Sequence, residues 1–225
     1  MRTNQEYKNS ALARLDGHWT PAVLATLVYL LIVIVFAGAY EVPGILNPAM
    51  PTSPESMSFI LGLGGVSLLV GIFIFYPLEV GYSNAMRVFY ERRDDEAVRN
   101  LFDFAKSNYL HKVWGMFLMN LKVFLWTLLF IIPGIVMAFA YAMTPYILEE
   151  HPEISAWEAS TRSRAMMRGH KFDLFYLYLS FIGWALLAIL TAGIGFLWLA
   201  PYASSSVAAF YNDLKEEQGE VAVTE

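Results

Sequence analysis

The most unusual chemical group in this sequence is Lys122, a cation inside a long apolar run. It precedes Pro133 by eleven residues. At about 1.5 Å per helical residue, that spacing places it roughly 16 Å from the turn, near the centre of a bilayer. A lysine at this depth either extends its ammonium toward the aqueous interface or acts as a buried functional cation. A functional cation needs a facing carboxylate, so Glu79 and Asp173 are its candidate partners, and Lys122 and Glu79 are candidate binding residues.

Two further groups of polar side chains are candidate binding residues. Ser204 belongs to a serine cluster in the last apolar run, which either packs against a neighbouring helix or lines a substrate path. Arg162, Arg164 and Arg168 lie in one amphipathic segment. Either this helix is only partly immersed in the headgroup layer, or its arginines recognise the headgroups of anionic lipids.

The sequence contains no pattern typical of a catalytic centre. It has no cysteine, which excludes disulfides, thiolate catalysis and cysteine-held metals. None of the four histidines has a second ligand at helical spacing. Glu149, Glu150 and Glu153 flank His151-Pro152 and are expected to lie in a solvated turn. We therefore predict no catalytic residue, no metal, no cofactor and no enzymatic activity.

The elements that position these residues are expected to be membrane helices. The chain is 57% hydrophobic and only 16% charged, whereas soluble domains are about 45–50% apolar and about 25% charged. The net charge of −5 argues against nucleic acid as a partner. A helix needs about 20 apolar residues to cross a bilayer. The sequence predicts an all-α bundle with six membrane spans, at residues 20–40, 57–80, 113–132, 134–149, 172–191 and 193–212.

The distribution of basic residues predicts the orientation of these spans. All but one of the fifteen Lys and Arg residues fall in polar stretches, and Lys122 is the exception. Basic residues accumulate on the cytoplasmic side of membrane proteins. The chain should therefore form three helical hairpins with both termini in the cytoplasm. The expected parts are a cytoplasmic amphipathic segment 1–19, a single membrane domain 20–212 and an acidic cytoplasmic tail 213–225.

Two cytoplasmic segments, near 95–107 and 155–168, have the periodicity of amphipathic helices lying on the membrane surface. In the second segment, Ser155 and Glu158 have the spacing of a helix N-cap, and Gly169 suits the position after the helix end.

Three prolines of the apolar runs are expected to face the bundle interior. Each proline frees a helix carbonyl, which must be satisfied by protein in lipid. These prolines are Pro77, Pro145 and Pro201.

A family resemblance becomes visible in the second half of the chain. The motifs are Leu128 to Ile135 (LLFIIPGI), Tyr141 to Glu149 (YAMTPYILE), Met167-Arg168-Gly169, Ser180 to Trp184 (SFIGW), and Pro201-Tyr202 with Phe210-Tyr211. In order and spacing this run resembles the uncharacterised bacterial integral membrane protein family filed as domain of unknown function 975. The resemblance implies a multi-pass protein of the bacterial cytoplasmic membrane. It implies no activity, substrate or catalytic residue.

Three functions are compatible with these features. The first is a non-catalytic membrane scaffold, assembly factor or lipid-interacting component. Its partners would be membrane lipids, with a protein at the cytoplasmic face or a second copy of the chain as further candidates. The alternative is a transporter or channel for a small solute or lipid that uses kinked helices and Lys122. An intramembrane enzyme is the third, but the nucleophile or metal it needs is not found in the sequence.

Overall fold

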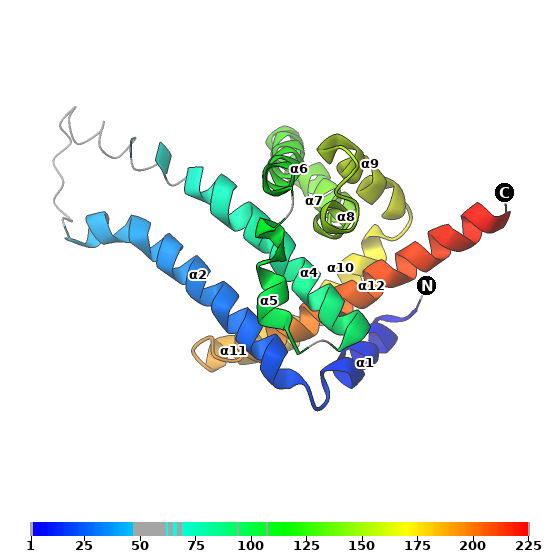
Figure 1. The fold of residues 1–225 in the computed structure, drawn as a ribbon, viewed down its shortest axis with the longest axis horizontal. Coiled ribbons are helices and arrows are strands. Elements are labelled where there is room, and N and C mark those ends of the chain that lie inside the picture. The colour runs from blue at the N-terminus through cyan, green and yellow to red at the C-terminus, as the bar shows by residue number, and fades with distance from the viewer. Residues whose placement is uncertain are drawn as a thin grey trace.

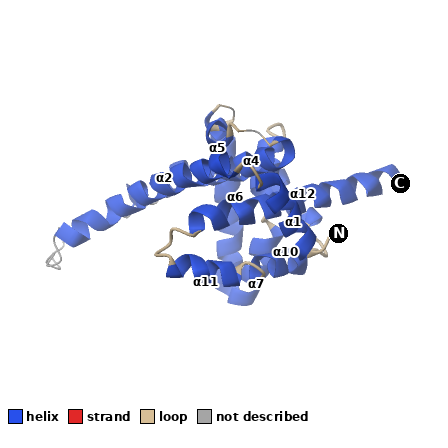
Figure 2. Cartoon of the chain, turned by 90° about the horizontal axis from the view of Figure 1, so that it is seen from below, coloured by secondary structure: helices blue, strands red, loops and turns tan. Residues whose placement is uncertain are grey.

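Every described element of the chain is helical. The computed structural model describes residues 2–46, 62, 65–66, 69–93, 95–106 and 108–224. Within these ranges Figure 2 shows helices and loops and no strand, which confirms the all-α prediction.

Figure 1 shows how the described helices are arranged. The first half contains α1 (Asn4–Leu15), α2 (Trp19–Leu46), the π-helix η1 (Gly71–Phe75), α4 (Tyr76–Arg92), α5 (Ala97–Leu101), the 3-10 helix η2 (Asp103–Ala105) and α6 (Tyr109–Leu129). The second half contains α7 (Ile131–Ala140), α8 (Thr144–Glu150), α9 (Ala156–Met166), α10 (Lys171–Leu179), α11 (Ile182–Leu190) and α12 (Phe196–Thr224).

Several helical stretches are long and apolar enough to cross a membrane. Among the described residues there are four, and each overlaps a predicted span: Trp19–Phe36, Tyr109–Leu129, Ile131–Glu150 and Lys171–Leu190. The predicted span 57–80 lies largely outside the described residues. The predicted span 193–212 corresponds to the first part of α12, which is not among the four. Six spans and the hairpin topology therefore stay predictions.

An apolar surface accompanies these helices. At the turn from α6 to α7, the five consecutive side chains of residues 128–132 are all large and apolar, and each is 65–75% exposed. A contiguous patch of this kind is unfavourable in water and marks a surface that meets lipid or another protein. The exposed side chains are thus the ones expected of a membrane protein.

The three prolines of the apolar runs face the protein interior, as predicted. Pro77 lies buried inside the continuous helix that η1 and α4 form, and Pro145 lies buried in the first turn of α8, where a missing amide hydrogen costs little. Pro201 lies buried inside α12. The helical stretch 131–150 is interrupted just before Pro145, so α7 and α8 are separate helices.

The polar N-terminal segment is part of the packed structure. The ring of Tyr7 meets Phe210 of α12 edge-on, with centroids 5.3 Å apart. The Tyr7 hydroxyl and the Arg2 amide both donate to the carboxylate of Asp213. Since α12 continues as one helix to Thr224, residue 213 lies within it and binds the start of α1.

The predicted surface helix near 95–107 is replaced by the short helices α5 and η2. Leu101 is fully buried in the core, and α5 packs against α2 and α4. A side chain at Gly81 of α4 would collide with the Leu101 carbonyl, so glycine permits this close approach. Leu101 therefore meets protein, whereas Phe102 and Ala105 of the same segment are exposed.

The predicted helix near 155–168 is present as α9, with the expected signals at both ends. The Ser155 hydroxyl accepts from the Glu158 amide at 3.1 Å, and Gly169 has a φ of +94°. Its inner face, however, packs against α6, α7 and α8. The Ser163 hydroxyl donates to the Ala140 carbonyl and accepts from the Met143 amide, each at 3.1 Å. Only the outer face of α9 is available to lipid or solvent.

Candidate functional site

Glu149 and Glu150 are the charged centre of the interior, and the prediction that they lie in a solvated turn is wrong. Both residues belong to the last turn of α8. Glu149 forms an ion pair of 2.6 Å with Lys112 of α6, whose side chain is only 1% exposed. A lysine this deeply buried requires a carboxylate partner.

Glu150 accepts from two other helices. Arg87 of α4 and Lys215 of α12 each approach its Oε1 at 2.8 Å, and the Tyr211 hydroxyl donates to Oε2. Arg87 also donates to the Asn84 side chain at 2.7 Å. We call Glu149, Glu150 and their partners the polar lock, because they join α4, α6, α8 and α12. The charged groups of the polar lock form ion pairs with one another across helices, so their role is to stabilise the fold.

Lys122 lies against aromatic rings and not against a carboxylate. Its ammonium is 3.8 Å from the ring centroid of Trp157 and 5.5 Å from that of Tyr141. No described residue forms an ion pair with it, and Asp173 instead lies 3.3 Å from His170. Cation–π contacts of this kind hold a lysine without a counter-charge. The sequence could not show this, because Trp157 lies on a different helix.

The three arginines of the predicted lipid site are all exposed at α9. Arg162 pairs with Glu158 at 2.8 Å, as its helical spacing allows, while Arg164 and Arg168 lie on the outer surface. Arg162 also borders a pocket of about 260 Å³ that includes Lys215. These side chains are accessible to an anionic headgroup.

Ser204 joins α12 to the helices of the first half. The Tyr82 hydroxyl is hydrogen-bonded to the Ser204 side chain and lies 2.9 Å from the Thr26 hydroxyl. The Tyr29 ring stacks on Tyr82 with centroids 4.6 Å apart. Glu79 lies about one helical turn before Tyr82 on the same face of α4. The structure therefore brings Glu79 and Ser204, which the sequence singled out separately, into one region.

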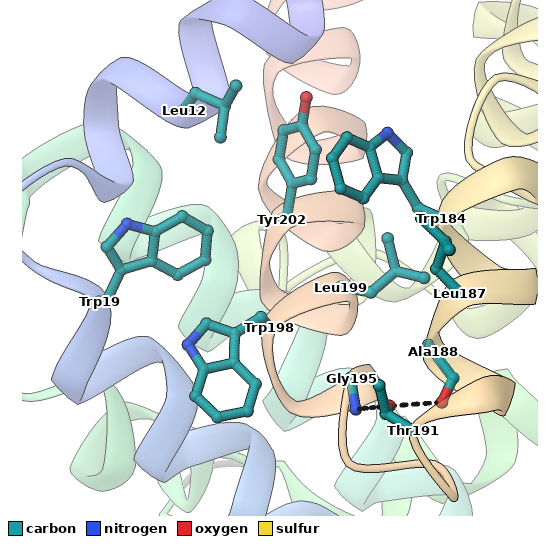
Figure 3. Close-up of a pocket in the computed structure, with 10 residues that line it drawn as sticks. All are labelled: Leu12, Trp19, Trp184, Leu187, Ala188, Thr191, Gly195, Trp198, Leu199 and Tyr202. Carbon is teal, nitrogen blue, oxygen red and sulfur yellow. Dashed lines mark hydrogen bonds between the residues drawn. The ribbon is translucent and has the colours of Figure 1, made fainter.

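An apolar cavity of about 410 Å³ opens between the α1–α2 and α11–α12 segments. We call it the tryptophan groove. Figure 3 shows indole rings from three helices around it. Its lining residues are Leu12, Trp19, Trp184, Leu187, Ala188, Thr191, Gly195, Trp198, Leu199 and Tyr202.

The polar groups at the bottom of the tryptophan groove are already bonded. The Thr191 hydroxyl donates to the Ala188 carbonyl at 2.7 Å and accepts from the Gly195 amide at 2.9 Å (Figure 3). The remaining surface offers mainly ring faces and aliphatic side chains. Sequence reasoning missed this groove, because Leu12 and Trp198 lie at opposite ends of the chain and no motif connects them.

Among the comparisons with known proteins, only the one with protein families found a match. No curated protein and no solved structure matches the chain. The model of the family described as "Protein of unknown function (DUF975)" matches residues 128–218. This match covers the motifs on which the sequence resemblance rests, and it confirms the resemblance of this chain to that family.

Proposed function

We propose that this chain is a non-catalytic, lipid-interacting protein of the bacterial cytoplasmic membrane. The observation that carries the proposal is the tryptophan groove, an apolar cavity on a protein whose helices are suited to a bilayer. Its occupant would be an acyl chain of a membrane lipid.

The chemistry of the groove favours an acyl chain over a polar ligand. A cavity of about 410 Å³ lies within the range of small-ligand sites. A polar ligand would lose its hydrogen bonds to water there and find few replacements, which is unfavourable. An alkyl chain loses nothing of this kind, and the rings of Trp19, Trp184 and Trp198 offer it a broad apolar contact.

The helix packing supports the expected topology of the proposal. α2 packs with α4, α6 with α7, and α11 with α12, as three successive hairpins would require. Arg2 lies beside Asp213, so the start of α1 and the second half of α12 are on the same side of the molecule (Figure 1). An even number of spans places them so, and the basic residues of the polar stretches assign that side to the cytoplasm.

Filling the groove tests the proposal. Leu187→Trp adds a large ring to a lining position that is 55% exposed, so the fold should tolerate it. Leu190→Trp, on the same helix but outside the groove and 81% exposed, is the matched control. Mass spectrometry of lipid retained after mild detergent extraction should show less lipid on Leu187→Trp than on Leu190→Trp. Equal retention by both variants and the unmodified protein would overturn the proposal.

The alternative is a transporter or channel for a small solute or lipid, and it rests on kinked helices and Lys122. Lys122, which that alternative invoked, packs against Trp157. We therefore expect Lys122→Leu to leave solute flux in liposomes unchanged. A specific loss of flux in a folded Lys122→Leu protein would restore the lysine to the path.

A further inference from the structure

A second cavity, of about 260 Å³, lies where α8, α9 and α12 meet. Its lining includes Arg162, Lys215 and His151, and none of the described residues that line it is acidic. We call it the basic pocket. The residues that line the tryptophan groove, in comparison, carry no charge. The two cavities therefore suit ligands of different chemistry.

The spacing of the lining residues along the helices explains why polar groups converge on the basic pocket. Lys215 and Gln218 are three residues apart on α12, and Arg162 and Met166 are four apart on α9, so each pair shares one helix face. His151 follows the last residue of α8 directly. Since α9 packs against both α8 and α12, these faces meet at one place.

The two permanent cations of the basic pocket each have a carboxylate neighbour, yet both keep hydrogen-bond donors in reserve. Arg162 donates from Nε and Nη2 to Glu158, at 3.2 and 2.8 Å, and its Nη1 has no partner among the described residues. Lys215 donates to the two carboxylate oxygens of Glu150, at 2.8 and 3.1 Å, and an ammonium group has three hydrogens. Gln218 adds a side-chain amide, which can also donate.

The ion pairs around the basic pocket are of the weak, exposed kind. The side chains of Arg162, Lys215 and His151 are 44%, 42% and 42% exposed, whereas that of Lys112 in the polar lock is 1% exposed. Exposed ion pairs contribute little because water already stabilises both charges. An anion that accepts from several of these donors at once can therefore bind beside the existing carboxylates or displace one of them.

We propose that the basic pocket binds a phosphate group, carried either by a soluble anion or by a lipid headgroup. A phosphate group presents three or more acceptor oxygens, so it can accept from Arg162, Lys215 and Gln218 together. A carboxylate has only two oxygens and fits donors from two helices less well. The volume is below that of most drug-sized ligand sites, which suits a small anion. The proposal does not depend on the tryptophan groove or on its occupant.

Calorimetric titration of the full-length protein in phospholipid-free detergent micelles tests the site. Inorganic phosphate is the probe, and sodium chloride holds the ionic strength constant. We expect saturable binding by the unmodified protein. Arg162→Gln removes one cation and should weaken binding by about tenfold or more. Arg164→Gln is the matched control, because Arg164 is exposed on the same helix but does not line the pocket, and it should bind phosphate normally.

Two further changes test the shape and the charge of the pocket separately. Ala165→Leu fills the pocket without altering any charge and should weaken binding by about fivefold or more. Its control is Thr161→Leu, at an exposed position of α9 outside the pocket, which should bind normally. Glu158→Gln removes the carboxylate that competes for Arg162 and should tighten binding by about twofold to fivefold. A misfolded variant would not gain affinity.

Repeating the titration with phosphatidylglycerol in the micelles identifies the source of the phosphate group. Competition by this lipid, seen as weaker apparent binding of inorganic phosphate, would assign the pocket to a lipid headgroup, and unchanged binding would assign it to a soluble anion. Absence of saturable phosphate binding by the unmodified protein would overturn the proposal. So would equal affinity of Arg162→Gln and Arg164→Gln, or of Ala165→Leu and Thr161→Leu. Leu187→Trp should bind phosphate normally, which separates this test from that of the tryptophan groove.

Discussion

Glu149 and Glu79 are both carboxylates of helices in an apolar sequence, but their surroundings are opposite. Glu149 holds a fully buried ammonium at 2.6 Å. Glu79 has an exposed side chain and no ionic partner among the residues that the structure describes. The first arrangement holds helices together, and the second makes no ionic contact between helices.

The physical difference lies in desolvation. In a buried ion pair, each charge has lost its hydrating water and is stabilised by its partner. Removing one partner therefore leaves the other charge buried with neither water nor a counter-charge. Glu79 has no ion pair among the described residues that a substitution could break. The stability of the fold should therefore be sensitive to changes at the polar lock and insensitive to changes at Glu79.

The largest effect is expected for Lys112→Met. It leaves Glu149 buried without a counter-charge and should lower the free energy of unfolding by about 3–5 kcal/mol. The control is Lys106→Met, because the Lys106 side chain is 63% exposed beside Asp103. That change should cost no more than about 1 kcal/mol. Denaturant titration in mixed micelles measures both, and equal losses would contradict the assignment of Lys112 to the polar lock.

Asp213→Asn should have an intermediate effect, about 1.5–3 kcal/mol, since it weakens hydrogen bonds to a charged group. Burial raises the pKa of Asp213, but the hydrogen bonds from Tyr7 and the Arg2 amide outweigh it, so the pKa lies below the ordinary 3.8. A depressed folded-state pKa gives stability that is complete above the unfolded-state value and is lost as the pH falls through the folded-state value. The difference between Asp213→Asn and the unmodified protein should therefore be constant near neutral pH and shrink below about pH 4. Thermal unfolding across this range checks it, and a difference that grew on acidification would contradict the sign.

A smaller effect is expected for Lys215→Met, although Lys215 also binds Glu150. Its side chain is 42% exposed, and Arg87 and Tyr211 still hold Glu150. The loss should be at most about 1 kcal/mol. Comparison with Lys112→Met in the same titration shows whether burial of the cation decides the effect. A loss as large as that of Lys112→Met would show that it does not.

The smallest effect on stability is expected for Glu79→Gln, within about 0.5 kcal/mol of the unmodified protein. The substitution keeps the shape of the side chain and breaks no ion pair among the described residues. A loss of several kcal/mol in the same denaturant titration would mean that Glu79 has a structural partner and would remove the contrast with the polar lock.

The sequence predicted best the features that depend on neighbouring residues. The Ser155 cap and Gly169 set the two ends of α9, and both signals lie within a few residues of the turns that they form. The burial of Pro77, Pro145 and Pro201 followed from the need to satisfy freed carbonyls. The all-α class followed from the length of the apolar runs.

The predictions from sequence were wrong or incomplete where a contact depends on residues that lie far apart in the chain. Ser163 looked like part of a helix on the membrane surface, but its hydroxyl bonds Ala140 and Met143, so one face of α9 packs on protein. Lys122 was expected near a carboxylate or near water, but it lies over Trp157. The tryptophan groove combines Leu12 with Trp198 and has no counterpart in any short motif.

By itself, the sequence determined the helical class, the apolar runs and the local ends of helices, because these depend on composition and on bonds between near neighbours. Only the tertiary structure decided which charges are paired. Glu150 accepts from Arg87, 63 positions away, and from Lys215, 65 positions away. No local pattern separates these carboxylates from Glu79, since the burial and partners of a charge depend on how the helices pack.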